Sequence, residues 1–432
     1  MVTMLLLFLP AIFCKLRYIK IAQHLYMDSM KKRFVVIGAS AASIAFITKL
    51  RSFDKESEIT CLSGESYIPY NRCLLADYIS DDISFGDMVL KTEDFFKQQN
   101  ILLRLNTWVT QIDTKNNCVC IGDENIVYDY LFLGVGTRPF IPNIGAEDVK
   151  EGLFTFHTAD DAKKLSHYID QQKPSNVIVV GGGINGIECV SSLHSRHQAV
   201  GLIERSPQIL PTQADQQVVH HLTRMMQQKS IALFMGQEVE KICTKQGKVT
   251  SVLLKSGSHL MTECVVLATG STVNSDLLQD TGIATSHGSI VVDQCLKTNI
   301  DNVYAGGDVC TVQDMVTKKT VKSATWADAM LQGLCAATQF SQKPRLYPGY
   351  VGLRDSKFFE QDFYACGQTV DHDSDVESVI LKQDSILHAF YIKENCLIGF
   401  VLLGDISKLA DYKKIYLTQQ SVTKKDFVLP TQ

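Results

Sequence analysis

The sequence predicts an α/β protein in which one dinucleotide-binding domain is inserted into another, followed by a smaller α+β domain. Three observations support this fold class. Two small-residue turns each follow a short apolar run, further apolar strands recur between helical segments, and the chain after residue 343 carries alternating apolar patterns. The 432 residues are enough for two to four such domains, each with its own core.

The clearest motif lies in the segment NVIVVGGGINGIE, residues 176–188. Val177–Val180 predict a buried parallel strand, because they form a short unbroken apolar run that stops at glycine. Gly181, Gly183 and Gly186 then form G-x-G-x-x-G. Such glycines allow a tight turn, close approach of the backbone to a pyrophosphate, and close packing of helix on strand. The phosphates would face the N-terminus of the following helix.

An acidic residue at the expected distance strengthens this motif. The next apolar run, Ala199–Ile203, ends at Glu204, which lies 18 positions after Gly186. The acid that binds a ribose 2′-hydroxyl in dinucleotide sites follows at about 20 residues. With a helix predicted from Ile187 onward, these features favour a Rossmann-like dinucleotide site over an ordinary turn between a strand and a helix.

A degenerate copy of the motif precedes it in the chain. The apolar strand Phe34–Ile37 is followed by Gly38, Ser40 and Ser43, and a helix is predicted through Leu50. Serine replaces two of the three glycines. It is small enough for close backbone approach, and its hydroxyl group can cap a helix. The function of the turn is therefore expected to survive.

The rest of the first domain is predicted from strands and glycine turns. The strand Ile59–Leu62 leads to Glu65, the only carboxylate there that fits the position of a ribose-binding acid. A helix over Thr92–Gln99 and short strands follow, and the strand Leu131–Leu133 closes the block at a turn containing Gly136.

Two later strands repeat this pattern. Cys264–Ala268 ends at a turn containing Gly270, and Asn302–Ala305 leads into Gly307 and Asp308. We assign both strands to the first domain, so the second domain is predicted as an insertion. The predicted borders are 30–150 with 263–342 for the first domain, 151–262 for the second, and 343–432 for the C-terminal domain.

The C-terminal part alternates apolar and polar residues. Lys322–Phe340 predicts a helix with one buried face, and a proline- and glycine-containing linker follows. Strands are predicted at Ser378–Lys382, His388–Lys393 and Leu397–Leu403, with a helix from Ser407. The alternation favours a mostly antiparallel sheet with a helix on one face.

Composition and the N-terminus bound the location and the partners. The formal net charge is −4 and no long basic run occurs, which argues against a nucleic-acid partner. The 13 cysteines include no C-x-x-C, which is typical of a reducing cytoplasm and predicts no structural metal. Met1–Cys14 is apolar but shorter than the roughly 20 residues of a membrane span. Residues 1–29 are therefore expected to be an extension outside the fold, with a weak membrane tether as the less favoured alternative.

Taken together, the motifs resemble one family. GASAAS, ESYIPYNRCLLADYI, LGVGTRP, GGGINGIE, ATGSTVN, YAGGDV and GLRDSKFFEQDFYACG resemble those of the pyridine nucleotide–disulfide oxidoreductases. The resemblance is to the branch with rubredoxin reductases and the flavin portion of nitrite reductases. It covers nearly all of residues 30–413 and implies FAD in the first domain and NADH or, less favoured, NADPH in the second. It leaves a homodimer open, because the C-terminal domain forms a dimer interface in some relatives only.

The resemblance also implies roles for single residues. Asp308 would bind the ribityl chain of FAD or, alternatively, only cap a helix. Glu188 would face the nicotinamide or simply complement a helix dipole. Glu204 would favour NADH, because a carboxylate repels the 2′-phosphate of NADPH. The FAD-binding residues implied are Gly38, Ser40, Ser43, Glu65, Arg72, Gly136, Gly270, Gly307 and Asp308, and those for NAD are Gly181, Gly183, Gly186, Glu188 and Glu204.

One residue decides between the functions that this family allows. Many relatives carry a C-x4-C pair beside the flavin, and this sequence has only Cys73. Cys73 is either a redox thiol activated by Arg72 or a small buried hydrophobe, and its setting in PYNRCLL favours the hydrophobe. Cys73 and Glu188 are therefore the candidate catalytic residues.

Three functions follow. The favoured one is an FAD-dependent NAD(P)H oxidoreductase that passes electrons to a rubredoxin-like or iron–sulfur protein. The second is a coenzyme A-disulfide reductase or NADH oxidase that uses Cys73. The third is an NADH-responsive flavoprotein scaffold.

Overall fold

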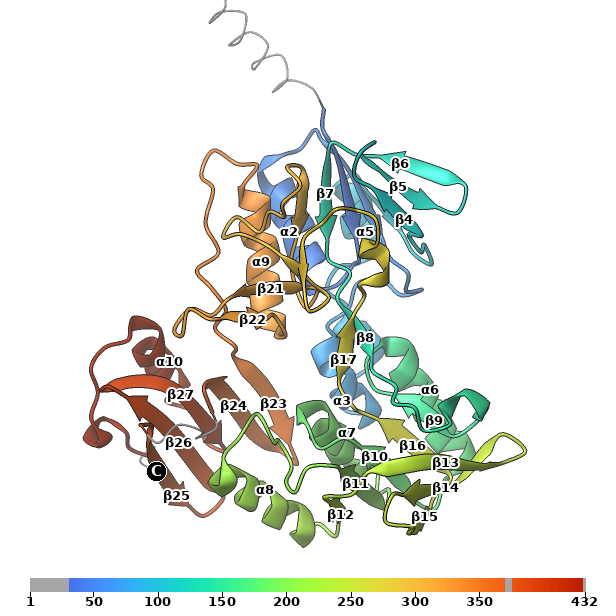
Figure 1. The fold of residues 1–432 in the computed structure, drawn as a ribbon, viewed down its shortest axis with the longest axis vertical. Helices are drawn as coiled ribbons and strands as arrows, with labels where there is room; N and C mark the ends of the chain where they lie inside the picture. The colour runs from blue at the N-terminus through green and yellow to red at the C-terminus, as the bar shows by residue number, and fades with distance from the viewer. Residues whose placement is uncertain (1–30, 370–374, 430–432) are drawn as a thin grey trace, which may run out of the picture.

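The protein was analysed as a computed structural model that describes residues 31–369 and 375–429. The predicted extension of residues 1–29 lies outside the described residues. Three sheets organise the chain: one in the upper part of Figure 1 and two in the lower part. No helix in the described ranges has the length and apolar character needed to cross a bilayer.

The first sheet contains five parallel strands in the order β20-β7-β1-β2-β3. Its central strand β1 is buried along four of its five residues, as the apolar run predicts. The strands are β1 (Arg33–Ile37), β2 (Glu58–Leu62), β3 (Ile101–Arg104), β7 (Tyr130–Leu133) and β20 (Val303–Ala305).

Two helices, α2 (Ala41–Phe53) and α9 (Trp326–Thr338), cross closely on this sheet. At the crossing, a side chain on Gly333 would place its Cβ 1.9 Å from the carbonyl oxygen of Ala42. Only glycine fits that contact. Because α9 follows β20, the crossing holds the last strand and the following turn against the first glycine turn.

Smaller elements surround the first sheet. The predicted helix over Thr92–Gln99 is confirmed as α5 (Glu93–Gln98). The others are β4 (Gln111–Asp113), β5 (Cys118–Ile121), β6 (Glu124–Val127), β18 (Thr285–Ser286), β19 (Ser289–Val291), β21 (Cys310–Gln313) and β22 (Thr320–Lys322). Two short helices from the same part of the chain, α3 (Leu75–Ile79) and α4 (Phe85–Met88), instead contribute to the core around the second parallel sheet.

The second sheet is also parallel, in the order β12-β11-β10-β16-β9. Its strands are β9 (Leu153–Thr155), β10 (Val177–Val180), β11 (Val200–Glu204), β12 (Ala232–Met235) and β16 (Cys264–Leu267). The helices are α6 (Ala159–Gln172), α7 (Ile184–Ser195) and α8 (Gln216–Gln228), and a small sheet holds β13 (Val239–Lys245), β14 (Lys248–Leu254) and β15 (His259–Met261).

Two predictions in this part are wrong. The helix α7 begins at Ile184 instead of Ile187, because Gly183 occupies its N-cap and the third glycine lies inside its first turn. The strand β16 was assigned to the first domain, but it pairs with β10 and β9 in the second sheet. The second sheet therefore extends past the predicted border at residue 262, to Leu267.

The chain crosses between the two parallel sheets twice. The outgoing strand β8 (Thr137–Pro139) pairs antiparallel with the returning strand β17 (Ser271–Val273). Figure 1 shows this pair running between the upper and lower parts of the molecule. The sheet order and this crossing show that the second parallel sheet is inserted into the chain of the first.

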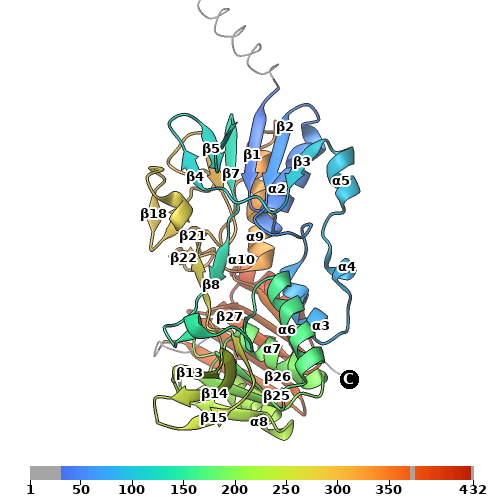
Figure 2. The same cartoon turned by 90° about the vertical axis from the view of Figure 1, so that its right-hand side faces the viewer.

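The C-terminal sheet is antiparallel throughout, in the order β23-β24-β27-β26-β25, as the alternation predicts. Phe358 and Phe359 of this sheet share a core with Val190 and Leu193 of α7. Figures 1 and 2 show the sheet beside the second parallel sheet. The elements are β23 (Arg354–Phe358), β24 (Gln361–Gly367), β25 (Glu377–Gln383), β26 (Ile386–Lys393), β27 (Cys396–Leu403) and α10 (Leu409–Thr418).

Candidate cofactor and catalytic site

The first glycine turn joins β1 to α2 at the carboxyl edge of the first sheet. Gly38 has a φ of +92°, and a Cβ there would lie 2.2 Å from the carbonyl oxygen of Gly134. Ser40 is the N-cap of α2, but its hydroxyl group makes no capping hydrogen bond. The N–H groups of the first helical turn are therefore left for a ligand, and an anion is the ligand that such a turn favours.

Ser43 has a different place from Ser40. It lies in the first turn of α2 and is 1% exposed. A side chain on Gly134 would place its Cβ 2.1 Å from the Ser43 Oγ, so Ser43 packs helix against strand as a third glycine would. Its hydroxyl group has no hydrogen-bond partner among the described residues.

The segment after β2 links the first sheet to the second. The Glu65 carboxylate accepts hydrogen bonds from Arg72 Nη2 at 2.8 Å and from the Tyr70 hydroxyl at 2.6 Å. The Tyr70 hydroxyl accepts from the N–H of Ala159 at the start of α6, and Arg72 Nη1 donates to the carbonyl oxygen of His157. Each oxygen of Glu65 thus already accepts a hydrogen bond within this link.

Arg72 and Asp308 lie close enough to interact electrostatically. The Asp308 carboxyl group has no hydrogen bond from the part of the chain that the structure describes. Burial raises its pKa, and the positive charges of Arg72 and Lys322 oppose that shift. The Arg72 Nε is buried and also has no partner among the described residues. The Asp308 carboxyl group could accept hydrogen bonds from hydroxyl groups of a bound FAD, and the Arg72 Nε–H could donate to its phosphate groups.

A buried glutamine holds the glycine turn that precedes Asp308. Gly307 has a φ of +86°, and its N–H donates to Gln332 Oε1 at 2.7 Å. Gln332 is fully buried on α9, and its Nε2 donates to Ser323 Oγ and to the Tyr347 hydroxyl. The helix crossing on the first sheet therefore also fixes the turn that carries Asp308.

The second glycine turn repeats the first with intact glycines. Gly181 has a φ of +112°, and a Cβ there would lie 2.3 Å from the carbonyl oxygen of Ala268. A Cβ on Gly186 would lie 1.8 Å from the carbonyl oxygen of Gly181. Around Gly183, by contrast, the space is open to 4 Å. The turn is therefore closed where protein meets protein and open where a pyrophosphate would approach.

Glu204 ends β11 and is 8% exposed. Its Oε2 accepts from the N–H of Gly182, and its Oε1 accepts from the N–H of Ser206, both at 2.7 Å. The carboxylate therefore holds the glycine turn to the loop after β11. Each oxygen keeps a second lone pair, which suits the ribose hydroxyl groups of a dinucleotide.

Two further glycines that were predicted to bind FAD follow strands of different sheets. Gly136 follows β7 at the edge of the first sheet, with a φ of +60°. Gly270 follows β16, which belongs to the second sheet, and so it lies on the side of Gly181. Its predicted place at the first site followed from the wrong placement of β16, which pairs with β10.

Glu188 lies where the second parallel sheet meets the C-terminal sheet. Its Oε1 accepts from the Ser356 hydroxyl on β23 at 2.6 Å. Burial raises the pKa of Glu188 to about 7, the negative charges of Asp77 and Asp355 add to the shift, and the Ser356 hydrogen bond opposes it. This carboxyl group can therefore hold or release a proton near neutral pH.

Cys73 lies near Glu188, Arg72 and Asp308, in a short 3₁₀ turn whose Asn71 side chain accepts from the Cys73 N–H. The residue is exposed, but the surrounding protein desolvates the thiol and raises its pKa to about 12. The negative charge of Glu188 raises it further, and Arg72 only partly compensates. The charge balance is thus opposite to that of an activated thiol.

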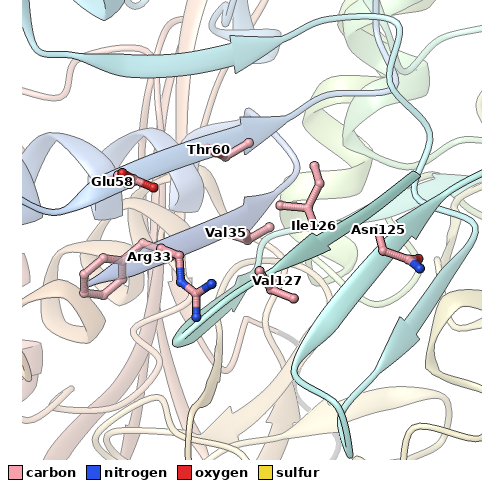
Figure 3. A pocket seen from close by; sticks show the side chains of 8 residues that line it. Arg33, Val35, Glu58, Thr60, Asn125, Ile126 and Val127 are labelled. Carbon is pink, nitrogen blue, oxygen red and sulfur yellow. The ribbon is translucent and has the colours of Figure 1, made fainter. Parts of the chain in front are cut away.

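One hollow of the described chain lies away from these residues. It has a volume of about 270 Å³ and lies between the amino-terminal halves of β1 and β2 and the strand β6. Figure 3 shows Val35, Thr60 and Ile126 among the side chains that line it. Gly38 lies at the opposite end of β1, so this hollow is not part of the candidate site.

Three residues of the site were not predicted. Tyr70 lies within the segment ESYIPYNR, which was expected to be part of the site, but nothing in the segment indicated a role for the Tyr70 hydroxyl group. Ser356 lies within the quoted segment GLRDSKFFEQDFYACG, but nothing there indicated its contact with Glu188, and Gln332 carried no signal. Both contacts join residues that are far apart in the chain, so they depend on tertiary packing and not on local pattern.

Several known proteins are similar to this chain in sequence and fold. An NADH oxidase of Methanocaldococcus jannaschii is 31% identical over 324 residues, which covers 73% of this chain and 72% of that protein. Among solved structures, reduced CoADR-RHD of Bacillus anthracis is 25% identical with a TM-score of 0.86, covering 93% of this chain and 77% of the other. NADH:rubredoxin oxidoreductase of Clostridium acetobutylicum shares the fold at 22% identity and a TM-score of 0.74, covering 91% and 96%.

The family itself follows from a longer match. Residues 32–333 match the family model of the pyridine nucleotide-disulphide oxidoreductases, a span that holds both glycine turns and Asp308. That family implies FAD and NAD(P)H as cofactors, and the open glycine turns and the polar groups of Arg72 and Asp308 suit them. The chain belongs to the pyridine nucleotide-disulphide oxidoreductase family and is an FAD-dependent NAD(P)H oxidoreductase.

Proposed function

We propose that this enzyme passes electrons from NADH through FAD to a small redox protein, rubredoxin-like or iron–sulfur, without using a cysteine. The observation that carries the proposal is the environment of Cys73. Desolvation and the Glu188 carboxylate hold its pKa at about 12, so almost no thiolate is present at neutral pH. A thiol that stays protonated is a poor nucleophile, and the flavin is then the sole redox group.

The residues divide into two binding sets. The turn of Gly38 and Ser40 with Asp308 would hold FAD, and the turn of Gly181 and Gly183 with Glu204 would hold NADH. When bound, the two cofactors supply hydride transfer from the nicotinamide to the flavin, and the protein supplies their orientation. The close packing around both turns supports this division, because it leaves only the ligand side of each turn open.

We propose that the Glu188 carboxyl group takes up and releases a proton where the nicotinamide binds. Its carboxyl group, hydrogen-bonded to Ser356, has a pKa of about 7 and so exists in both protonation states at neutral pH. A carboxyl group of this kind can release or take up the proton that accompanies hydride transfer. Removing its charge is expected to change the pH dependence of reduction more than the binding of NADH.

The preference for NADH rests on Glu204. Its buried carboxylate ends β11 beside the second glycine turn, where the adenosine ribose of the nicotinamide dinucleotide would lie. A 2′-phosphate there would meet a negative charge at close range. The exposed Arg205 next to it limits the preference without reversing it.

The proposal is tested by following flavin reduction and electron delivery separately. Purified enzyme is mixed with NADH or NADPH under anaerobic conditions, and flavin absorbance is followed in a stopped-flow instrument. NADH should reduce the flavin faster than NADPH, and a purified rubredoxin should support turnover. Rapid turnover would exclude the scaffold function. Slow reduction by both nucleotides, or no electron delivery to rubredoxin or to an iron–sulfur protein, would contradict the proposal.

A second candidate function uses Cys73 as a thiol in a reductase of coenzyme A disulfides or in an NADH oxidase. It is favoured by the position of Cys73, which is exposed and lies near Arg72, Glu188 and Asp308. The similarity to CoADR-RHD and to an NADH oxidase also supports it. In its oxidised form this enzyme would carry Cys73 as a mixed disulfide with coenzyme A or as a sulfenic acid, and either form takes up two electrons in addition to those on the flavin. The two functions are therefore separable by titration.

A further inference from the structure

The carboxyl edge of the first sheet carries one residue that the proposed cofactor set does not use. The strand order places Asp308 after β20 at one end, the turn of Gly38 after β1 in the middle, and Trp108 beyond β3 at the other end. Four strand spacings separate the two ends, roughly 19 Å. An extended dinucleotide with its ribityl chain at Asp308 and its pyrophosphate at Gly38 therefore points its adenosine toward Trp108.

The backbone holds Trp108 firmly in place. Beyond β2 and β3 the two chains stay paired, because the Thr107 N–H donates to the Ser63 carbonyl oxygen at 2.7 Å and the Asn106 N–H donates to that of Glu65 at 3.0 Å. The residue between these two acceptors is Gly64. The position of Trp108 is thus set by main-chain hydrogen bonds on both sides of Gly64.

The indole ring lies against Gly64. A Cβ on Gly64 would be 2.7 to 2.8 Å from three neighbouring atoms of the indole ring, Cε2, Cδ2 and Cζ2. Similar distances to three adjacent ring atoms place the ring face, and not its edge, on the glycine. Trp108 is nevertheless 73% exposed, more than any other large hydrophobic side chain of the described residues. A large part of the indole is thus open to a ligand.

The acid predicted at the adenosine end of this edge already has two protein partners. Glu65, the carboxylate predicted for the ribose, is bound to Arg72 and Tyr70. Gly64, the residue before it, has no side chain to offer. The adenosine of the cofactor would therefore meet an aromatic ring at a position where dinucleotide sites usually present a carboxylate.

We propose that Trp108 binds the adenine of FAD by stacking, with Gly64 serving as the platform under the indole ring. An exposed indole offers a large flat apolar surface, and nucleobases stack on such rings without needing a specific hydrogen-bond pattern. This inference rests on FAD lying along the first sheet, which is part of the proposed function. It assigns the retention of FAD to Trp108, in place of the hydrogen bonds of a ribose-binding acid.

The first test measures how fast the holoenzyme loses FAD. After dilution, free FAD is followed by its fluorescence for the wild type and for Trp108→Ala, Trp108→Phe and Leu102→Ala. Leu102→Ala is the matched control, because Leu102 is a 57% exposed apolar residue on β3 itself. Trp108→Ala should release FAD about tenfold faster, equivalent to about 1.4 kcal/mol. Trp108→Phe should recover part of the loss, and Leu102→Ala should match the wild type.

The second test uses the fluorescence of Trp108 itself. The sequence has two tryptophans, so Trp326→Phe leaves Trp108 as the sole emitter. Trp108 emission should be quenched strongly in the FAD holoenzyme and much less after reconstitution with FMN, which has no adenine. Equal emission with FAD and FMN, or unchanged FAD release in Trp108→Ala, would overturn the inference.

The failure of this inference can be told apart from failure of the proposed function. If Trp108 does not stack on adenine, the wild type still carries FAD and NADH still reduces it. If the proposed function fails, the purified wild type carries no flavin, or its flavin is not reduced by NADH. The absence of bound flavin in the wild type would overturn both.

Discussion

The substitution Glu188→Gln tests the raised pKa of a buried carboxyl group. In the folded protein the pKa of Glu188 is raised from 4.5 to about 7, chiefly by burial and then by Asp77 and Asp355. The unfolded chain releases this proton as pH rises through the ordinary pKa of the carboxyl group, and the folded chain holds it until about pH 7. The folded state therefore loses stability through that window and does not regain it above.

The expected size follows from the shift. Keeping Glu188 ionised in the folded protein costs about 3 kcal/mol relative to a neutral side chain, since each pKa unit corresponds to about 1.4 kcal/mol. Glutamine has the same shape, is never ionised and can still accept from Ser356. Glu188→Gln should therefore be more stable than the wild type at about pH 8 and similar to it at about pH 5.

The assay is thermal unfolding of the purified enzyme at several pH values. The midpoint for Glu188→Gln should exceed that of the wild type by several degrees at about pH 8. Glu147→Gln is the control, because Glu147 is exposed and its substitution should leave the midpoint unchanged at every pH. A difference between Glu188→Gln and the wild type that stays constant from about pH 5 to about pH 8 would refute the assignment of this proton to Glu188.

Two further predictions concern packing and nucleotide choice. Gly333→Ala should destabilise the enzyme by about 1 to 3 kcal/mol, because its Cβ would lie 1.9 Å from the carbonyl oxygen of Ala42. Gly86→Ala should be nearly neutral in the same thermal unfolding experiment, because its Cβ would make only an ordinary contact of 3.5 Å with Ser84 Oγ. Equal midpoints for the two variants would contradict the close crossing. Glu204→Gln should raise the KM for NADH about tenfold and narrow its advantage over NADPH, because it removes the charge beside the ribose. An unchanged ratio of kcat/KM for the two nucleotides would show that Glu204 does not set the preference.

Much of the fold was predictable from sequence because its signals are local. The apolar runs before Gly38 and Gly181 predicted buried strands, and both are buried as β1 and β10. The strand β16 was placed in the wrong sheet for a related reason. Its run CVVL looks the same whichever parallel sheet it enters, and only its pairing with β10 decides.

The site was less predictable than the fold, because it depends on where side chains turn. Glu65 has the right position in the sequence for a ribose ligand, but Arg72 and Tyr70 draw its carboxylate toward the second sheet. The pKa of Cys73 likewise follows from groups on three other elements, among them Glu188 and Asp308. Neither effect has a signature in the residues that flank these positions.

The central claim, that electrons leave the flavin without a thiol, is tested most directly by anaerobic titration with NADH. The wild type, Cys73→Ser and the control Cys295→Ser are first treated with coenzyme A disulfide, which would convert a reactive Cys73 into a mixed disulfide and release coenzyme A as the thiol. Excess disulfide is removed, and each enzyme is titrated while flavin absorbance is followed to its end point. We expect all three to take up two electrons per FAD, because a Cys73 thiol that stays protonated does not attack the disulfide. Uptake of about four electrons by the wild type and by Cys295→Ser, reduced to two in Cys73→Ser, would contradict the account and establish the thiol as a redox group.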